Sequence, residues 1–164
     1  PPDRDDIERR IFAQRDRFPW IVFENGGDVL GYAYASSHHE RQAYQWSVNV
    51  SVYVDPRAQR AGVGRALYTA LFGILRRQQF VNAYGGITLP NDASVGLHTS
   101  MGFVPVGVYK SVGFKFGAWH DVLWLHLRLS DAATPAGDPL PLAGLFEDRH
   151  VAASLAACAE AVRL

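Results

Sequence analysis

The stretch from Val52 to Arg65, VYVDPRAQRAGVGR, constrains the fold more than any other part of the chain. A β-rich run leads into a loop that carries Gly62 and Gly64, and the loop opens a segment whose apolar residues recur at helical spacing. The first turn of a helix leaves backbone N–H groups unpaired and carries the positive end of the helix dipole. This strand, loop and helix therefore predict a site for a phosphate group.

Two common nucleotide-binding motifs do not fit this loop. A Walker loop requires Lys followed by Ser or Thr after its last glycine, whereas Arg65 and Ala66 follow here. A dinucleotide fingerprint requires three glycines after the first strand of its unit, whereas this loop has two and lies in the middle of the chain. Nucleoside triphosphate chemistry and hydride transfer are both disfavoured.

Hydrophobic periodicity predicts a mixed sheet flanked by helices, an α/β (α+β) fold. Residues 46–54 alternate between an apolar face and a polar face that carries Asn49. Helices are expected at 6–17, 65–79 and 93–100, and strands at 20–24, 29–35, 46–54, 83–89, 104–112 and 122–129. A loop is expected between the last two strands, with Gly113, Gly117, Trp119 and His120 in it.

The chain has 164 residues, which is enough for one domain of ordinary size. We expect this domain to occupy residues 1–130. Residues 131–145 are rich in Pro, Ala and Gly, as linkers are, and residues 150–164 are rich in Ala. Residues 131–164 are therefore predicted to form a linker and a C-terminal helix or tail.

Charge, hydropathy and cysteine content limit the partners, metal sites and location that we expect. Sixteen basic residues balance sixteen acidic ones, which gives no reason to expect nucleic acid as a partner. No apolar run approaches the roughly 18 residues of a membrane span, so no membrane is expected either. Cys158 is the only cysteine, which disfavours a metal cluster or a redox pair. The charged start is unlike a signal peptide, so a cytoplasmic location is expected.

A family resemblance rests on the Q-x-x-G-x-G pattern at Gln59, Gly62 and Gly64, which is similar to the signature of the GNAT superfamily of N-acetyltransferases. The resemblance implies a mixed, mostly antiparallel sheet and acetyl-coenzyme A as co-substrate, with no metal. It also implies that backbone amides hold the coenzyme pyrophosphate at Arg60, Ala61, Gly62, Val63, Gly64 and Arg65. The backbone of the preceding strand would pair with the pantetheine arm at Val52, Tyr53 and Val54.

A second segment, LPNDASVGLH followed by Met101-Gly102-Phe103, is similar to the second coenzyme-binding segment of that family. The resemblance implies that Asn91 contacts the cofactor and that His98 lies close to the thioester sulfur. By position alone, Asn91 would be read as a helix cap, and both roles can coexist.

Further matches resemble the phosphinothricin and methionine sulfoximine acetyltransferases of this superfamily. They run from about Phe18 to Leu129 and include FPW, GYAYA, AYQW, SVYV and WHDV. This branch acetylates the amino group of small amino-acid-like acceptors, and the resemblance also implies a homodimer. Arg41 lies where relatives have an Arg available for a carboxylate or phosphinate, which a guanidinium binds bidentately, although it can equally be an ordinary surface Arg.

Two departures from the branch affect the acceptor site. The chain begins where relatives already have a first strand and the helices that wall the acceptor pocket, so we expect that part of the fold to be missing and the site to be incomplete. Asn49 stands where relatives carry a Glu that is their presumed base. An amide cannot accept the proton of an ammonium group at neutral pH.

The chemistry needs an oxyanion donor, an acid and a base. The backbone N–H of Val52 can hold the thioester oxygen, and His98 can protonate the leaving thiolate. The base is open between His120, which strand alternation turns away from its neighbour Asp121, and the loop pair His38 and His39. Two other functions are also open: a coenzyme A-binding protein without catalysis, and an acetyltransferase for another amine. Arg41 disfavours a polycationic acceptor.

Overall fold

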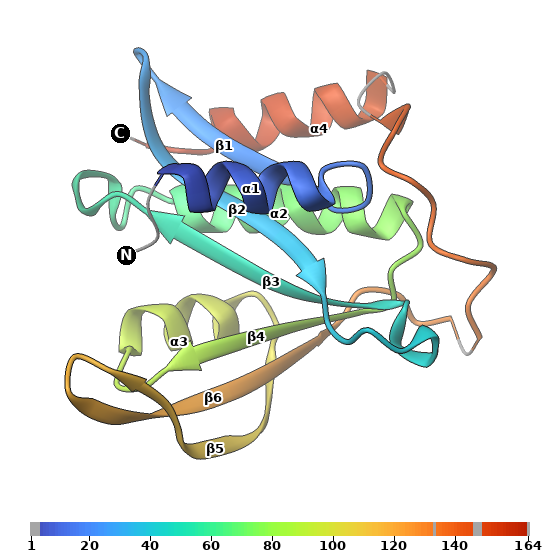
Figure 1. Cartoon of the computed structure of the whole chain (residues 1–164). Coiled ribbons are helices and arrows are strands. Elements are labelled where there is room, and N and C mark those ends of the chain that lie inside the picture. The colour runs from blue at the N-terminus through green and yellow to red at the C-terminus, as the bar shows by residue number, and fades with distance from the viewer. Residues whose placement is uncertain (1–3, 133, 146–148, 164) are drawn as a thin grey trace.

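The computed structural model describes residues 4–132, 134–145 and 149–163. Its elements follow the order that the sequence predicts, with ends that differ by a few residues (Figure 1). In chain order they are α1 (Arg4–Gln14), β1 (Trp20–Asn25), β2 (Asp28–Ser37), η1 (Gln42–Tyr44), β3 (Ser47–Val54), η2 (Pro56–Ala58), α2 (Val63–Arg77), β4 (Asn82–Thr88), α3 (Asp92–Ser100), β5 (Val104–Lys115), β6 (Ala118–Arg128) and α4 (Arg149–Glu160).

The strands form one six-stranded sheet in the order β1-β2-β3-β4-β6-β5. Within the described residues every neighbouring pair is antiparallel except β3 and β4, which are parallel. Helix α2 connects these two strands, as a parallel pair requires a crossover. The prediction of a mixed, mostly antiparallel sheet flanked by helices is confirmed.

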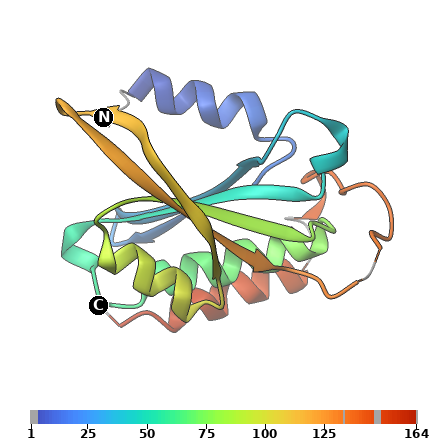
Figure 2. The same cartoon turned by 90° about the horizontal axis from the view of Figure 1, so that it is seen from below.

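The main core lies between the sheet and α2. Figure 2 shows α2, α3 and α4 on one side of the sheet and α1 on the other. The apolar face of α2 packs on inward-facing residues of the central strands, because those residues recur with period two in β3 and at helical spacing in α2. The largest fully buried members of this core include Val48, Val63, Tyr68, Leu71, Leu75, Phe80 and Leu125.

The parallel pairing of β3 and β4 is short, and it decides where a ligand can enter. The ladder joins Ser47 to Asn82 and ends with Asn49 beside Tyr84. Beyond that pair the two strands diverge toward their C-terminal ends, as Figure 1 shows. The backbone of β3 from Val50 to Val54 therefore has β2 on one edge and an opening on the other.

The prediction of a loop with Gly113, Gly117, Trp119 and His120 between the last two strands is wrong. Gly113 pairs with His120 and Phe114 with Trp119, so both strands continue into a long hairpin. The rings of Phe114 and Trp119 meet edge to face at 5.2 Å, which favours the cross-strand pairing that the glycines alone do not suggest. The turn itself lies at Phe116 and Gly117, which both have positive φ.

The C-terminal segment lies against the rest of the molecule. Gly137 accepts a hydrogen bond of 2.7 Å from the indole of Trp46, and the backbones of Gln78 and Leu140 are bonded at 2.8 Å. Helix α4 packs along α2, with Val151 buried between them. No helix among the described residues is both long enough and apolar enough to cross a membrane.

Candidate functional site

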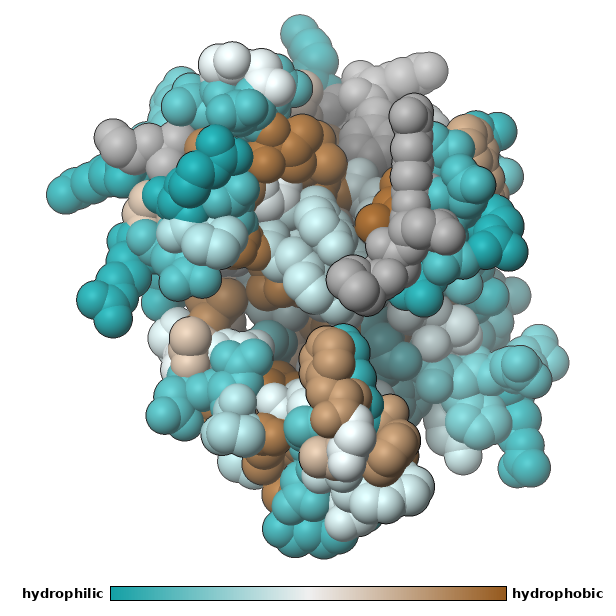
Figure 3. Space-filling view, turned by 60° about the vertical axis from the view of Figure 1, so that its left-hand side comes forward, coloured by the Kyte–Doolittle hydropathy of each residue, from teal (hydrophilic) through white to brown (hydrophobic). Residues whose placement is uncertain are grey.

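A groove of about 1070 Å³ opens between the diverging ends of β3 and β4. Its walls come from β3, the η2–α2 loop, the start of α2, the end of β4 and α3. Figure 3 shows this side of the molecule hollowed between an upper and a lower lobe. The groove is lined by all the cofactor-binding residues predicted from the sequence except Ala61, and by His98 of the catalytic set.

The loop before α2 presents backbone donors to this groove. Gly62 caps the helix in the left-handed region, with φ of 94°. The first intrahelical bond of 3.0 Å runs from Ala66 N to Gly62 O, so the amides of Val63, Gly64 and Arg65 have no partner within the helix. A Cβ on Gly64 would lie 3.0 Å from a methyl of Leu97, so a larger residue would require Leu97 to shift. The loop therefore has the unpaired backbone amides on which the prediction of a phosphate site rests.

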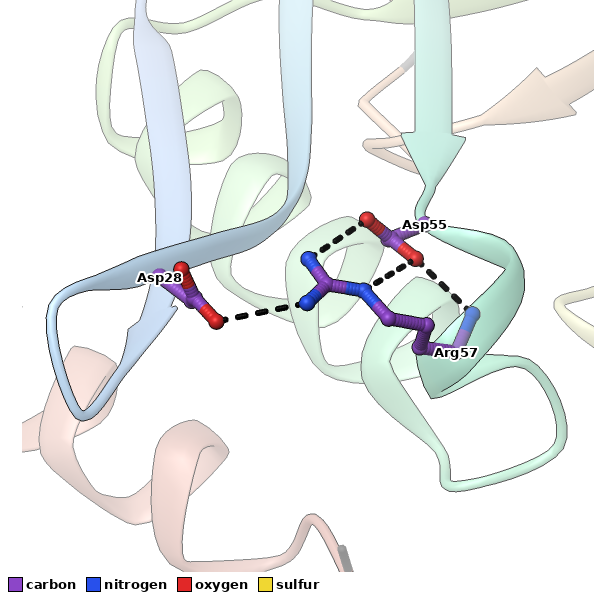
Figure 4. A network of polar contacts seen from close by, with 3 residues as sticks. All are labelled: Asp28, Asp55 and Arg57. Carbon is purple, nitrogen blue, oxygen red and sulfur yellow. Dashed lines mark hydrogen bonds and ion pairs between the residues drawn. The ribbon is translucent and has the colours of Figure 1, made fainter.

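A polar network holds the entrance of this loop in place (Figure 4). The guanidinium of Arg57 binds both oxygens of Asp55 at 3.0 Å and reaches Asp28 at 3.3 Å. Asp55 also accepts a 2.8 Å bond from the backbone N–H of Arg57 and so caps η2. These bonds hold the pKa of Asp55 below its usual range. The network ties the end of β3 to the β1–β2 turn.

The open edge of β3 follows from its pairing with β2. Asp55 N donates to Leu30 O at 2.9 Å, and in an antiparallel ladder such hydrogen-bonded pairs alternate with unbonded ones. The backbone of Tyr53 therefore points to β2, whereas the N–H and C=O groups of Val52 and Val54 point into the groove. Val52 and Val54 fit their predicted roles toward an extended ligand, but the backbone of Tyr53 does not.

The two groove residues predicted at α3, Asn91 and His98, both make hydrogen bonds within the protein. Asn91 caps α3, because its Oδ1 accepts from Ser94 N at 3.1 Å. His98 is 4% exposed, and its Nδ1 lies 2.8 Å from the Ser94 carbonyl, so Nδ1 is the donor. Its Nε2 then accepts from the hydroxyl of Tyr68 at 2.8 Å. The hydrogen between the two side chains therefore belongs to Tyr68, and His98 Nε2 is its acceptor.

Burial shifts the pKa of both side chains in this pair. It lowers the pKa of His98, although the hydrogen bond to Ser94 opposes that effect, and it raises the pKa of Tyr68 well above the usual value of a phenol. Both shifts favour the neutral forms. Sequence reasoning missed Tyr68, because it lies among the apolar residues of α2 and has the spacing of an ordinary core residue.

The candidate bases and Arg41 lie in different places. Nδ1 of His38 lies 2.8 Å from Oδ1 of Asn49 at the last β3–β4 pair, on the face of the sheet away from α2, and neither residue lines the groove. His39 and Arg41 line a separate pocket of about 440 Å³ beside η1. His120 lies on the β5–β6 hairpin, where its Nε2 is 3.1 Å from the Lys115 carbonyl. The structure thus brings Asn49 and His38 together where β3 and β4 part, and it leaves His39, Arg41 and His120 elsewhere.

The sheet, the splayed strands and the loop define an α/β protein suited to a long, phosphate-bearing cofactor. The chain matches the model of the acetyltransferase (GNAT) domain family over residues 4–124, and it belongs to that family. The resemblance inferred from the signature residues is confirmed.

Two curated relatives and one solved structure are similar to the chain. Phosphinothricin N-acetyltransferase of Streptomyces viridochromogenes is 45% identical over 118 residues, which are 72% of this chain and 62% of the relative. The L-methionine sulfoximine/L-methionine sulfone acetyltransferase of Salmonella typhimurium is 36% identical over 72% of this chain and 69% of the relative. A phosphinothricin acetyltransferase from Sinorhizobium meliloti, solved with acetyl-CoA, has a TM-score of 0.73 and 31% identity over 91% of this chain and 80% of that one.

Proposed function

We propose that the chain transfers the acetyl group of acetyl-CoA to the amino group of a small amino-acid-like acceptor of the phosphinothricin or methionine sulfoximine type. The observation that carries the proposal is the groove between β3 and β4, which joins an open strand edge to a helix N-terminus with free amides. The names of the relatives support the choice of acceptor.

The groove offers protein groups for the pyrophosphate and for the pantetheine arm of the cofactor. The amides of Val63 to Arg65 would bind the pyrophosphate, and the guanidinium groups of Arg60 and Arg65 add positive charge beside them. The open backbone groups of Val54 and the C=O of Val52 would pair with the pantetheine arm as a strand does. From Val54 back to Val50 the strand spans about 13 Å. The acetyl group would then lie between Val52, whose N–H would hold the thioester oxygen, and the last β3–β4 pair, which is three residues back along β3.

Two measurements test this function on the full chain. Acetyl-CoA should raise the melting temperature, because a ligand that binds only the folded state stabilises it. Release of free thiol should then depend on an amine, with phosphinothricin and methionine sulfoximine ahead of spermidine and of a peptide N-terminus. Binding without thiol release for any amine would favour the non-catalytic alternative, and a preference for spermidine would favour a different acceptor.

We also propose that the protein is a homodimer. Strand β5 is at the edge of the sheet, and apolar side chains along it are exposed: Val104, Val106, Val108, Val112 and Phe114. An open apolar edge strand tends to pair with another chain. Sedimentation velocity at tens of micromolar should give a dimer, and Val106→Lys should shift it toward monomer. A monomeric wild type at that concentration contradicts the proposal.

A further inference from the structure

His38 lies where β3 and β4 part, on the side of the sheet away from α2. It follows directly on β2, and its imidazole contacts both members of the last β3–β4 pair, Asn49 and Tyr84. A cofactor with its pyrophosphate at the Gly62 loop and its arm along β3 would direct its thioester toward this pair. The inference below therefore rests on the proposed function and names a residue for its chemistry.

The hydrogen bonds fix which ring nitrogen of His38 carries the hydrogen. The amide nitrogen of Asn49 donates to the Ser37 carbonyl at 3.3 Å, so the amide oxygen faces the imidazole. That oxygen lies 2.8 Å from Nδ1 and can only accept, so Nδ1 is the donor. The free lone pair is then on Nε2, which has no hydrogen-bond partner among the described residues.

Aromatic rings hold the imidazole in this orientation. It stacks on Tyr84 with 4.2 Å between ring centroids, and it meets Trp124 edge to face at 6.2 Å and Tyr44 at 6.5 Å. The titratable side chains that contact it are those of Tyr84 and Tyr44. No carboxylate or guanidinium among the described residues is bonded to it.

A buried donor beside His38 indicates that this place takes a polar ligand. The indole Nε1 of Trp124 is buried and has no hydrogen-bond partner among the described residues. Such a donor is unfavourable unless a ligand accepts its hydrogen. An oriented imidazole with a free lone pair, next to an unsatisfied N–H, is unlike the packing of an ordinary core.

We propose that His38 is the general base of the transfer and that Asn49 is the positioning residue that holds its tautomer. Nε2 takes one proton from the ammonium group of the acceptor, and the lone pair of the amine attacks the thioester carbonyl carbon. The electron pair of the C–S bond leaves with the sulfur. The second proton lost by the nitrogen ends on that sulfur, and His38 returns its proton to solvent.

The first experiment is His38→Gln in the full chain. Loss of a general base should lower kcat at pH 7 by about 10²–10⁴-fold. The melting-temperature shift with acetyl-CoA should stay, because the pyrophosphate loop is untouched. The remaining rate should rise with pH toward the pKa of the acceptor amine, since solvent must then supply the free amine. His126→Gln is the matched control, because His126 also contacts Tyr84 but is hydrogen-bonded to Asn82. The activity of this variant should equal that of the wild type.

The second experiment tests Asn49 without any turnover. Nitrogen-15 NMR of the ligand-free protein should show the Nδ1–H tautomer of His38 in the wild type. Asn49→Leu should remove this preference and lower kcat, and Asn49→Asp should restore the tautomer because it keeps the oxygen. A wild-type His38 with its hydrogen on Nε2 would overturn the role given to Asn49.

A rescue separates chemistry from folding. In the His38→Gln protein, Asn49→Glu places a carboxylate one methylene closer to the vacated ring position, so activity at pH 7 should partly return. A His38→Gln protein as fast as the wild type would overturn the role of His38 and leave the proposed function intact. A wild type that binds acetyl-CoA but acetylates no amine would overturn both. If His120→Gln or His39→Gln alone removes activity, the base is there.

Discussion

The two sides of the diverging strands are built in different ways. On the side of α2, the groove consists mainly of backbone: free amides at the start of the helix and the open edge of β3, placed by a short continuous segment from Val52 to Arg65. On the other side, the polar cluster consists of side chains from separate segments, among them His38, Asn49, Tyr84 and Trp124. The first side therefore depends on backbone geometry and tolerates many side chains, whereas the second depends on the identity of each residue.

The largest effect is expected on acetyl-CoA affinity, from a change in the groove lined by backbone. Gly62→Asp should weaken acetyl-CoA binding by at least ~100-fold, or about 3 kcal/mol, because a side chain with negative charge would stand beside the pyrophosphate. Isothermal titration measures this directly. Gly117→Asp is the matched control, because Gly117 also has positive φ and open space but lies in the β5–β6 turn. Equal affinities for both variants would place the cofactor elsewhere.

A pair of neighbouring glycines compares the two sides through stability. A Cβ on Gly85 would lie 2.8 Å from Nε2 of His98, whereas a Cβ on Gly86 would lie 3.4 Å from the ring of Trp124. Gly85→Ala should therefore disturb the bond between His98 and Tyr68 and lower the free energy of unfolding by about 1–3 kcal/mol. Gly86→Ala should change it by about 0.5 kcal/mol or less. Urea unfolding of both variants tests the difference. A larger loss of unfolding free energy in Gly86→Ala than in Gly85→Ala would contradict the prediction.

The smallest effect concerns pH. Burial lowers the pKa of His98 in the folded state below its ordinary value of 6.5, so the unfolded chain takes up the proton first as the pH falls. Stability is therefore full above about pH 6.5 and declines below it, by less than about 1 kcal/mol between pH 7 and pH 6 for one histidine. His98→Gln should make the free energy of unfolding less dependent on pH over this range. His126 is shifted in the same direction and should leave a residual slope. An unchanged slope in the variant would contradict the shift.

The groove lined by backbone could be predicted from the sequence. In the side-chain cluster the sequence named His38 and Asn49 but not their contact. A strand, two glycines and a helix in one continuous segment specify the groove, because each step is local. The correction at Tyr53 needed the register with β2, which the sequence of β3 alone does not contain. The contact of His38 with Asn49 joins residues 11 apart across two strands, and the neutral pair of His98 and Tyr68 joins residues 30 apart. By sequence alone, Asn49 indicates the loss of a base. Its hydrogen bond with His38 suggests instead that it positions one.

The segment that follows α4 contacts the loop that is proposed to bind the pyrophosphate. The amide of Arg163 donates to Ala61 O at 3.0 Å, and the carbonyl of Ala161 is 3.9 Å from the position of a Cβ on Gly62. Ligand occupancy and local opening of residues 161–163 are therefore coupled energetically. Deuterium uptake at the Arg163 amide should slow when acetyl-CoA binds, so a part of the chain far along the sequence from the loop can report on whether the groove is filled.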